Sequence, residues 1–183
     1  MKKIVLTLSV LLVLILALAM TSCGGNTETT TEAPVTTEAP LPEGYTLYDN
    51  GDISFAYPDN LSKTDGSTVI LLNLINGNNI TVVYEAKTDM YAKMDNNDYA
   101  ELFKPMFEEM GMTIAKYNVE QIKNAKGISL TKVTHTASTQ GKTMEQTMLI
   151  TTVGNKTYTV TVTEVVNDDA FVNNVLNSLG LAK

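Results

Sequence analysis

Few side chains in this sequence could carry out chemistry. The 183 residues include one cysteine, Cys23, and one histidine, His135. A Cys/His zinc cage or a multi-histidine metal site needs several such ligands, so both are excluded. His135 falls in a segment with strand character and has no nucleophile placed beside it, so we interpret it as an ordinary strand residue. We therefore predict no metal site and no cofactor.

Two short motifs resemble catalytic signatures, but their context does not fit. Ser129 and Lys132 have the Ser-x-x-Lys spacing of penicillin-binding enzymes. That chemistry needs both groups on one face of a helix, whereas residues three apart on a strand point to opposite faces. Gly141-Lys142-Thr143 resembles the end of a phosphate loop, but Thr136 stands where the first glycine is required. We expect no catalytic residue and predict that the protein is not an enzyme.

The thiol of Cys23 is the exception, because its position suggests a modification. Met1-Lys2-Lys3 precedes an apolar run over residues 4–20, and Met20-Thr21-Ser22-Cys23 follows. This pattern resembles the lipobox of bacterial lipoproteins, with Met20 in place of the usual leucine. The resemblance implies that residues 1–22 are a signal peptide, removed before Cys23 receives a diacylglyceryl thioether. The protein would then be anchored to the cell membrane by lipid, on the extracytoplasmic face.

Two other interpretations of the N-terminus stay open. The apolar run of about 17 residues is slightly shorter than the roughly 20 that span a bilayer, so it could be an uncleaved membrane anchor. It could also be a secretory signal that is cleaved without lipidation. Two or more acyl chains on Cys23 would give stable anchoring, where one chain is marginal.

Residues 23–43 have the composition of a tether. They are rich in Thr, Glu and Pro, and the six residues 30–35 nearly repeat at 36–41. Such a segment cannot bury enough apolar surface to fold. Fully extended at roughly 3 Å per residue, it reaches on the order of 60 Å. We predict a disordered spacer, and the threonines leave open a glycosylated stalk.

Charge narrows the partners of the remaining chain. Removing Lys2 and Lys3 with the signal takes the net charge from −7 to −9, and every basic residue is lysine. Phosphate contacts dominate nucleic-acid affinity, so nucleic acid is excluded as a partner. An acidic surface also has no basic cluster to grip anionic lipid. The lone cysteine rules out an intramolecular disulfide, so residues 44–183 must fold on their core alone.

Turn signals and alternating apolar residues organise this domain. Asp49-Asn50-Gly51-Asp52 lies between two apolar strands and predicts a hairpin, and Asn76-Gly77 predicts a second. Four residues in a turn are too few for an EF-hand calcium loop. Residues 69–74 are almost continuously apolar, which suggests a central strand. Further strands are predicted at roughly 113–122, 126–137, 143–153 and 156–165.

Two helices complete the pattern. Residues 98–111 have apolar residues at spacings of three and four, with a capping box from Asp98 and Glu101 and a kink or break at Pro105. The methionines around this helix are interpreted as core, with an adaptable binding groove as the alternative. A closing helix begins after Asn167 or Asp168 and ends at Gly180. In the preceding strand, alternate threonines are expected on a solvated or helix-rimmed face. The class is α+β, an antiparallel sheet flanked by helices.

Asp52-Ile53-Ser54-Phe55-Ala56-Tyr57-Pro58 resembles the "S-F-x-Y-P" opening of PsbP-like domains, a fold shared with Mog and with small bacterial lipoproteins. The predicted helix, Gly127 before a long strand, and Asn177-Ser178-Leu179 near the end also match. The resemblance covers residues 44–183 and implies an antiparallel sheet sandwiched between helices. Members of this family mostly bind other proteins, and no catalytic residue set comes with the resemblance.

These features together predict a membrane-anchored extracytoplasmic lipoprotein. Its domain is expected to be a non-catalytic binding or scaffolding module for a protein or an envelope component. One alternative is a carrier of a small molecule or lipid with an apolar pocket of a few hundred Å³. The other is a hydrolase that uses two converging carboxylates.

Overall fold

The computed structural model describes residues 41–66 and 68–182. The predicted signal peptide, Cys23 and the linker up to residue 40 lie outside the described residues. No helix in these two ranges has the length and apolar character needed to cross a membrane. The description of the fold below therefore concerns the domain that follows the predicted tether.

The first hairpin forms a small sheet of its own. β1 (Tyr45–Asp49) and β2 (Ile53–Pro58) pair antiparallel, as the Asn-Gly signal predicted. β10 (Gly180–Leu181), at the end of the chain, pairs with the other edge of β2. In the turn, the side chain of Asn50 accepts hydrogen bonds from the amides of Asp52 and Ile53. The acidic turn thus uses its polar atoms to form the turn itself.

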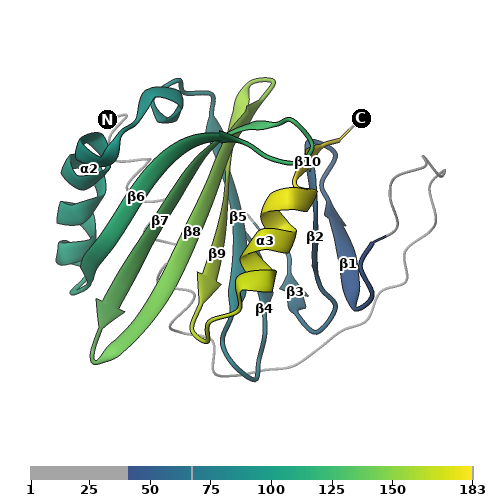
Figure 1. The fold of residues 1–183 in the computed structure, drawn as a ribbon, viewed down its shortest axis with the longest axis horizontal. Coiled ribbons are helices and arrows are strands. Elements are labelled where there is room, and N and C mark those ends of the chain that lie inside the picture. The colour runs from purple at the N-terminus through teal and green to yellow at the C-terminus, as the bar shows by residue number, and fades with distance from the viewer. Residues whose placement is uncertain (1–40, 67, 183) are drawn as a thin grey trace.

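The remaining strands form one antiparallel sheet in the order β3-β4-β5-β9-β8-β7-β6 (Figure 1). The strands are β3 (Ser62–Thr64), β4 (Val69–Leu72), β5 (Asn79–Ala86), β6 (Thr113–Lys123), β7 (Ser129–Thr139), β8 (Lys142–Val153) and β9 (Lys156–Glu164). The four strands predicted between residues 113 and 165 are all confirmed. The antiparallel sheets and accompanying helices make this an α+β domain.

The position of β4 corrects one expectation. Its apolar run predicted a central strand, yet β4 lies second from the edge and β9 is in the middle. Ile70 and Leu71, which point to opposite faces, are both buried, whereas all three residues of β3 are exposed. The apolar run therefore correctly indicated that both faces of β4 are buried. A strand can be buried on both faces without being central in the sheet.

One face of the large sheet is covered by the small sheet and by α3 (Asp169–Ser178) (Figure 1). Asp168 caps this helix by accepting a hydrogen bond from the amide of Phe171, which settles the predicted choice of cap. Phe171 and Val175 from α3 join the buried residues of β9 that point to this face, Tyr158, Val160 and Val162. This is the first of two apolar cores.

The opposite face is covered by the short helix η1 (Tyr91–Lys93) and by α2 (Asn96–Glu109). The second core lies beneath them and contains three methionines from this region: Met94, Met106 and Met112. Aromatic residues of α2 fill the space between these methionines. The interpretation of the methionines as core is therefore confirmed for these three, while Met90 remains exposed.

Two details of α2 differ from expectation. Its N-cap is Asp95, and the capping box joins Asp95 with Asp98, three residues upstream of the predicted pair. The helix also continues through Pro105 without a break. Proline removes the hydrogen bond to the carbonyl of Glu101, but both residues lie on the exposed side of the helix. Water can hydrogen-bond to that carbonyl. The helix therefore stays continuous, held by the packing of its buried side.

The end of α3 also differs. Gly180 was predicted to stop the helix, but it belongs to β10 and does not adopt a positive φ. Asn124, in the loop between β6 and β7, supplies the cap instead. Its amide nitrogen donates to the carbonyl oxygens of Leu176 and Leu179, at 3.0 and 2.6 Å. Its side-chain oxygen accepts from the amides of Lys126 and Ile128. Asn124 therefore joins the end of α3 to the loop between β6 and β7.

Candidate functional site

A cleft of about 360 Å³ lies where η1 meets the end of the large sheet. Residues from the loop after β5, from η1 and from the ends of three strands line it. The lining consists of Lys87, Thr88, Asp89, Tyr91, Ala92, Gln121, Ser129, Leu130, Thr131, Ile150, Thr151 and Thr152. Six of the twelve lining residues carry a hydroxyl group, and one lysine and one aspartate add charge. The cleft can therefore offer hydrogen bonds to a polar ligand.

Hydrogen bonds to the carbonyl oxygen of Tyr91 fix one wall of the cleft. Gln121 Nε2 donates to this oxygen at 3.1 Å, and Thr131 Oγ1 donates to it at 2.8 Å. The same amide group of Gln121 reaches the carbonyl oxygen of Met94 at 3.3 Å. β6 and β7 thus hold η1 at both of its ends, and the wall is preorganised.

The ring of Tyr91 is anchored by an acid on β5. Its hydroxyl donates to Glu85 Oε1 at 2.9 Å. Burial, and then the neighbouring carboxylate, raises the pKa of Tyr91 far above its usual value. Burial also raises the pKa of Glu85. Tyr91 therefore stays protonated at any physiological pH and serves as a hydrogen-bond donor.

The cleft has no pair of groups suited to nucleophilic catalysis. Ser129 lines it, but Lys132 is on the opposite face of β7 and lies 3.6 Å from Glu120 in an ion pair. The Ser-x-x-Lys spacing is thus not a catalytic pair here. Within residues 41–66 and 68–182, no three His, Cys, Asp or Glu side chains come together as a metal site.

His135 belongs to a row of buried polar residues that crosses the sheet beneath α2. The row comprises the cross-strand neighbours His135, Gln146, Thr163 and Asn79. His135 Nε2 donates to Gln146 Oε1 at 2.8 Å, and Gln146 Nε2 donates to Thr163 Oγ1 at 3.0 Å. Because an amide oxygen only accepts, Nε2 carries the proton, and Nδ1 accepts from the hydroxyl of Tyr99 at 2.9 Å.

Burial lowers the pKa of His135 to about 4. The imidazole is therefore neutral at physiological pH and is fully used by its two hydrogen bonds. The threonines of β9 were expected on a solvated or a helix-rimmed face, and the structure shows the second. Thr157, Thr161 and Thr163 are buried on the α2 side of the sheet. Threonine packs there because its hydroxyl can be satisfied inside a hydrogen-bonded row while its methyl group packs.

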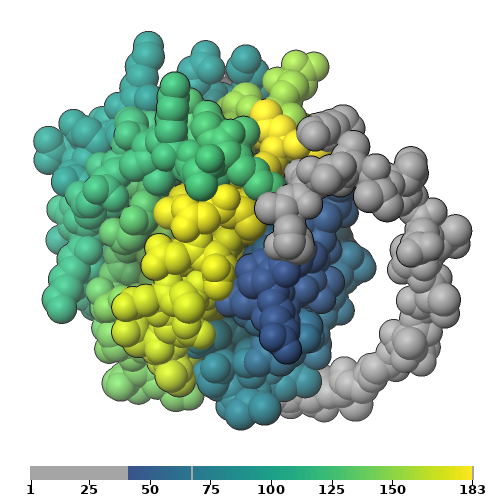
Figure 2. All heavy atoms as spheres, turned by 45° about the vertical axis from the view of Figure 1, so that its right-hand side comes forward, coloured from purple at the N-terminus to yellow at the C-terminus, as the bar shows by residue number. Residues whose placement is uncertain are grey.

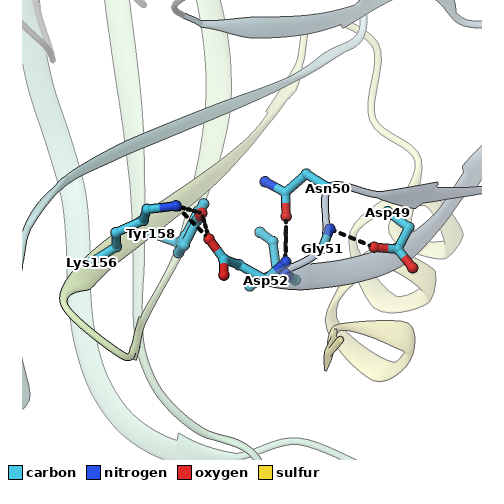
Figure 3. A network of polar contacts seen from close by, with 7 residues as sticks. Asp49, Asn50, Gly51, Asp52, Lys156 and Tyr158 are labelled. Atoms are coloured by element: carbon cyan, nitrogen blue, oxygen red, sulfur yellow. Dashed lines mark hydrogen bonds and ion pairs between the residues drawn. The ribbon is translucent and has the colours of Figure 1, made fainter. Parts of the chain in front are cut away.

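A second polar cluster joins the two sheets at the turn of the first hairpin (Figure 3). Lys156 Nζ lies 2.6 Å from Asp52 Oδ2, and the hydroxyl of Tyr158 donates to the same oxygen. The lysine also lies 4.9 Å from the ring centroid of Tyr84. The hydrogen bond from Lys156, followed by that from Tyr158, lowers the pKa of Asp52. The groups satisfy one another, so we interpret the cluster as a link between β2 and β9.

The structure places the other residues considered in the sequence at turns and helix ends. Gln140 and Gly141 both have positive φ and form the turn between β7 and β8, which excludes a phosphate loop at Gly141-Lys142-Thr143. Asp168 and Asp169 are the cap and the first residue of α3. None of these residues reaches the cleft. The cleft itself had no signal in the sequence, because its lining comes from five separate segments.

Comparison with known proteins gives no family. No protein-family model matches the sequence, and no curated protein matches it. Among solved structures, the chain is similar to a protein from Bacteroides thetaiotaomicron, with 15% identity and a TM-score of 0.45 over 72% of this chain. This chain covers 45% of that protein, less than half of its length.

A second similar structure is LpqN, described as involved in cell envelope biogenesis of Mycobacterium tuberculosis. Its identity to this chain is 12%, with a TM-score of 0.42, and the match covers 76% of this chain and 91% of LpqN. Similarity at this level identifies neither an activity nor a partner.

Proposed function

We propose that this protein is a lipid-anchored lipoprotein on the extracytoplasmic face of a cell membrane, and that its domain is a non-catalytic binding module. The signal-like N-terminus, Cys23 and the Thr/Glu/Pro-rich linker support the anchoring. A PsbP-like fold is part of the proposal. A helix on each side of an antiparallel sheet is compatible with that family's architecture. The partner is a protein or an envelope component.

The cleft beside η1 is the observation that carries the binding role. Its walls are held by hydrogen bonds before any ligand arrives, so little ordering is required on binding. Its hydroxyl groups, with Lys87 and Asp89, suit a polar segment such as a peptide or a glycan. A binding site of this kind needs no reactive group.

The two alternatives fit this cleft less well. Its volume is at the lower end of the roughly 300–1,000 Å³ typical of small-molecule sites, so a small polar ligand is the second candidate. A carboxylate-dependent hydrolase needs two carboxylates about 5–10 Å apart, and the lining of this cleft contributes Asp89 alone.

Filling the cleft is expected to abolish partner binding. Ala92 is exposed at the cleft wall, and Ala92→Trp places an indole in the space a ligand would use. We expect chemical crosslinking in native membranes to recover the partner at least about ten-fold less than with wild type. Thr143→Trp, at an exposed residue near the other end of β8 and outside the lining, is the matched control. Undiminished crosslinking of Ala92→Trp would rule out this cleft as the binding site.

A further inference from the structure

Two loops at the other end of the domain hold large apolar side chains in solvent. In the loop between β4 and β5, Leu74 is 74% exposed and Ile75 is 96% exposed. In the loop between β9 and α3, Val165 is 47% exposed and Val166 is 53% exposed. We call these four residues the apolar tip. Figure 2 shows the β4–β5 loop protruding below the hairpin and the start of α3.

The apolar tip is one surface, because Asn78 joins its two loops. This buried side chain accepts hydrogen bonds from the amides of Val165 and Val166, both at 2.9 Å. Its nitrogen donates to the carbonyl oxygen of Val166 at 2.9 Å. Val165 also packs directly beside Gly77, whose added Cβ would lie 3.4 Å from a Val165 methyl group. The four apolar residues therefore keep a fixed arrangement.

The β4–β5 loop is rigid in the conformation that exposes its apolar residues. Asn73 Oδ1 accepts hydrogen bonds from the amides of Ile75 and Asn76, at 2.9 and 3.3 Å. The backbone of Asn73 also bonds to Asn78 and to Gly77, both at 2.9 Å. Leu74 and Ile75 are thus held outward by the structure of the loop. Fixed, exposed apolar surfaces of this kind occur where a protein contacts a membrane or another protein.

The tether joins the domain at this same end. Gly44, where the linker enters β1, accepts a hydrogen bond from the amide of Asp59 at 2.9 Å. The chain then turns into β3, and Ser62 is the cross-strand partner of Leu72, which leads into the β4–β5 loop. The start of the folded chain and the apolar tip are therefore only a short turn and one strand pairing apart.

We propose that the apolar tip inserts into the lipid bilayer that anchors the protein and orients the domain on it. The inference rests on the lipid anchor of the proposed function. About 20 linker residues reach at most on the order of 60 Å, so the anchor keeps the tip at a high local concentration near the bilayer and a weak affinity is sufficient. A pair of protruding loops can enter the surface of a bilayer directly. A protein partner would need a groove shaped to receive them.

Charge specifies the kind of lipid surface. Asp168 and Asp169, two and three residues after Val166, are exposed. These carboxylates would be repelled by anionic headgroups, whereas the apolar side chains need no charge to insert. The contact is therefore with electrically neutral headgroups, and anionic lipid weakens it.

This orientation directs the cleft away from the membrane. β9 runs from Lys156, beside the cleft, to Glu164, beside the tip, which is nine residues of strand. At about 3.3 Å per residue, the cleft would lie roughly 25 Å above the tip. The proposed binding site would then face partners outside the cell membrane.

Site-specific fluorescence in vesicles tests the contact. Because lipid occupies the sulfur of Cys23, Ile75→Cys creates a single thiol for an environment-sensitive label such as NBD. The lipidated chain is reconstituted in phosphatidylcholine vesicles carrying a nitroxide lipid. We expect the label at residue 75 to shift to the blue and to be quenched several-fold more than a label introduced by Asn155→Cys at the opposite end. Adding phosphatidylglycerol should reduce the difference.

The outcomes separate this inference from the proposed function. Intact mass reports whether Cys23 carries lipid, and a chain without lipid contradicts the proposed anchor. In that case the same label is titrated with vesicles in a Cys23→Ala chain, where Leu74→Ser should weaken binding roughly ten-fold and Leu102→Ser should not. Equal, water-like signals at residues 75 and 155 would overturn the inference. Shielding of residue 75 in native membranes but not in protein-free vesicles would assign the tip to a protein partner and overturn it too.

Discussion

Asn124→Ala is expected to lower the free energy of unfolding by about 3 kcal/mol. The side chain makes four hydrogen bonds, two to carbonyls at the end of α3 and two to amides of its own loop. Each bond contributes about 1 kcal/mol, and a buried group left unpaired costs more. Alanine removes all four at once, at a site that is 8% exposed. Equilibrium urea unfolding measures the change.

The matched control for this variant is Asn155→Ala, which changes an exposed asparagine in the turn between β8 and β9. Surface changes of this kind usually alter stability by less than about 0.5 kcal/mol. If Asn124→Ala were no more destabilising than the control, Asn124 would not be the cap of α3. The loss should also appear first as exchange of amides at the end of α3, because that segment is released.

Acidification is expected to destabilise the domain through His135. In the folded protein the pKa of His135 is about 4, because the ring is buried, whereas in the unfolded chain it is near 6.5. Between these values the unfolded state binds a proton that the folded state does not, so stability falls as pH decreases from about 6.5 to 4. The full loss is on the order of 3 kcal/mol. Above pH 7 the contribution is complete and constant.

Comparison with His135→Gln isolates this contribution. Other groups also titrate in this range, including Glu85 and Glu164, whose pKa values are raised by burial. Their effects are common to both proteins and cancel in the difference between them. We expect the stability advantage of wild type over His135→Gln to shrink steadily from pH 7 to pH 4, measured by urea unfolding. A difference that does not change with pH would show that folding leaves the pKa of His135 unshifted, and would contradict its burial as a neutral ring.

Local patterns in the sequence were sufficient to predict most of the helices and strands. Strands β6 to β9 were predictable because Gln140-Gly141 and Gly154-Asn155 mark tight turns between alternating residues. α2 and α3 were predictable from apolar residues at spacings of three and four. These signals act over a few residues, so they survive without knowledge of the tertiary structure. Strand order depends on the tertiary structure. For this reason β4 was predicted to be central, although it lies second from the edge.

Polar contacts between distant residues could not be predicted. Asp52 and Lys156 are 104 residues apart, and Asn124 and Leu179 are 55 apart. Their meeting depends on how the two sheets and α3 pack. For a related reason, the sequence left the threonines of β9 open between a solvated and a helix-rimmed face. Threonine suits both a solvated face and a hydrogen-bonded row, and only the residues across the sheet decide between them.

The candidate sites divide in the same way. Cys23 is predicted from a contiguous N-terminal pattern, and it lies outside the described residues, so its lipidation stays a prediction. The cleft has no such pattern. Its preorganised wall forms because Gln121 and Thr131, on two different strands, both bond to Tyr91. No local spacing in the sequence predicts these contacts.

Intact mass spectrometry of the membrane fraction, comparing wild type with Cys23→Ala, tests the lipid-anchored account most directly. The account predicts that wild type lacks residues 1–22 and carries acyl mass on Cys23, and that the variant carries none. A wild-type chain that retains its full N-terminus would show that the apolar run is an uncleaved anchor. A chain cleaved without added lipid would show a secreted protein. Either result would contradict the account.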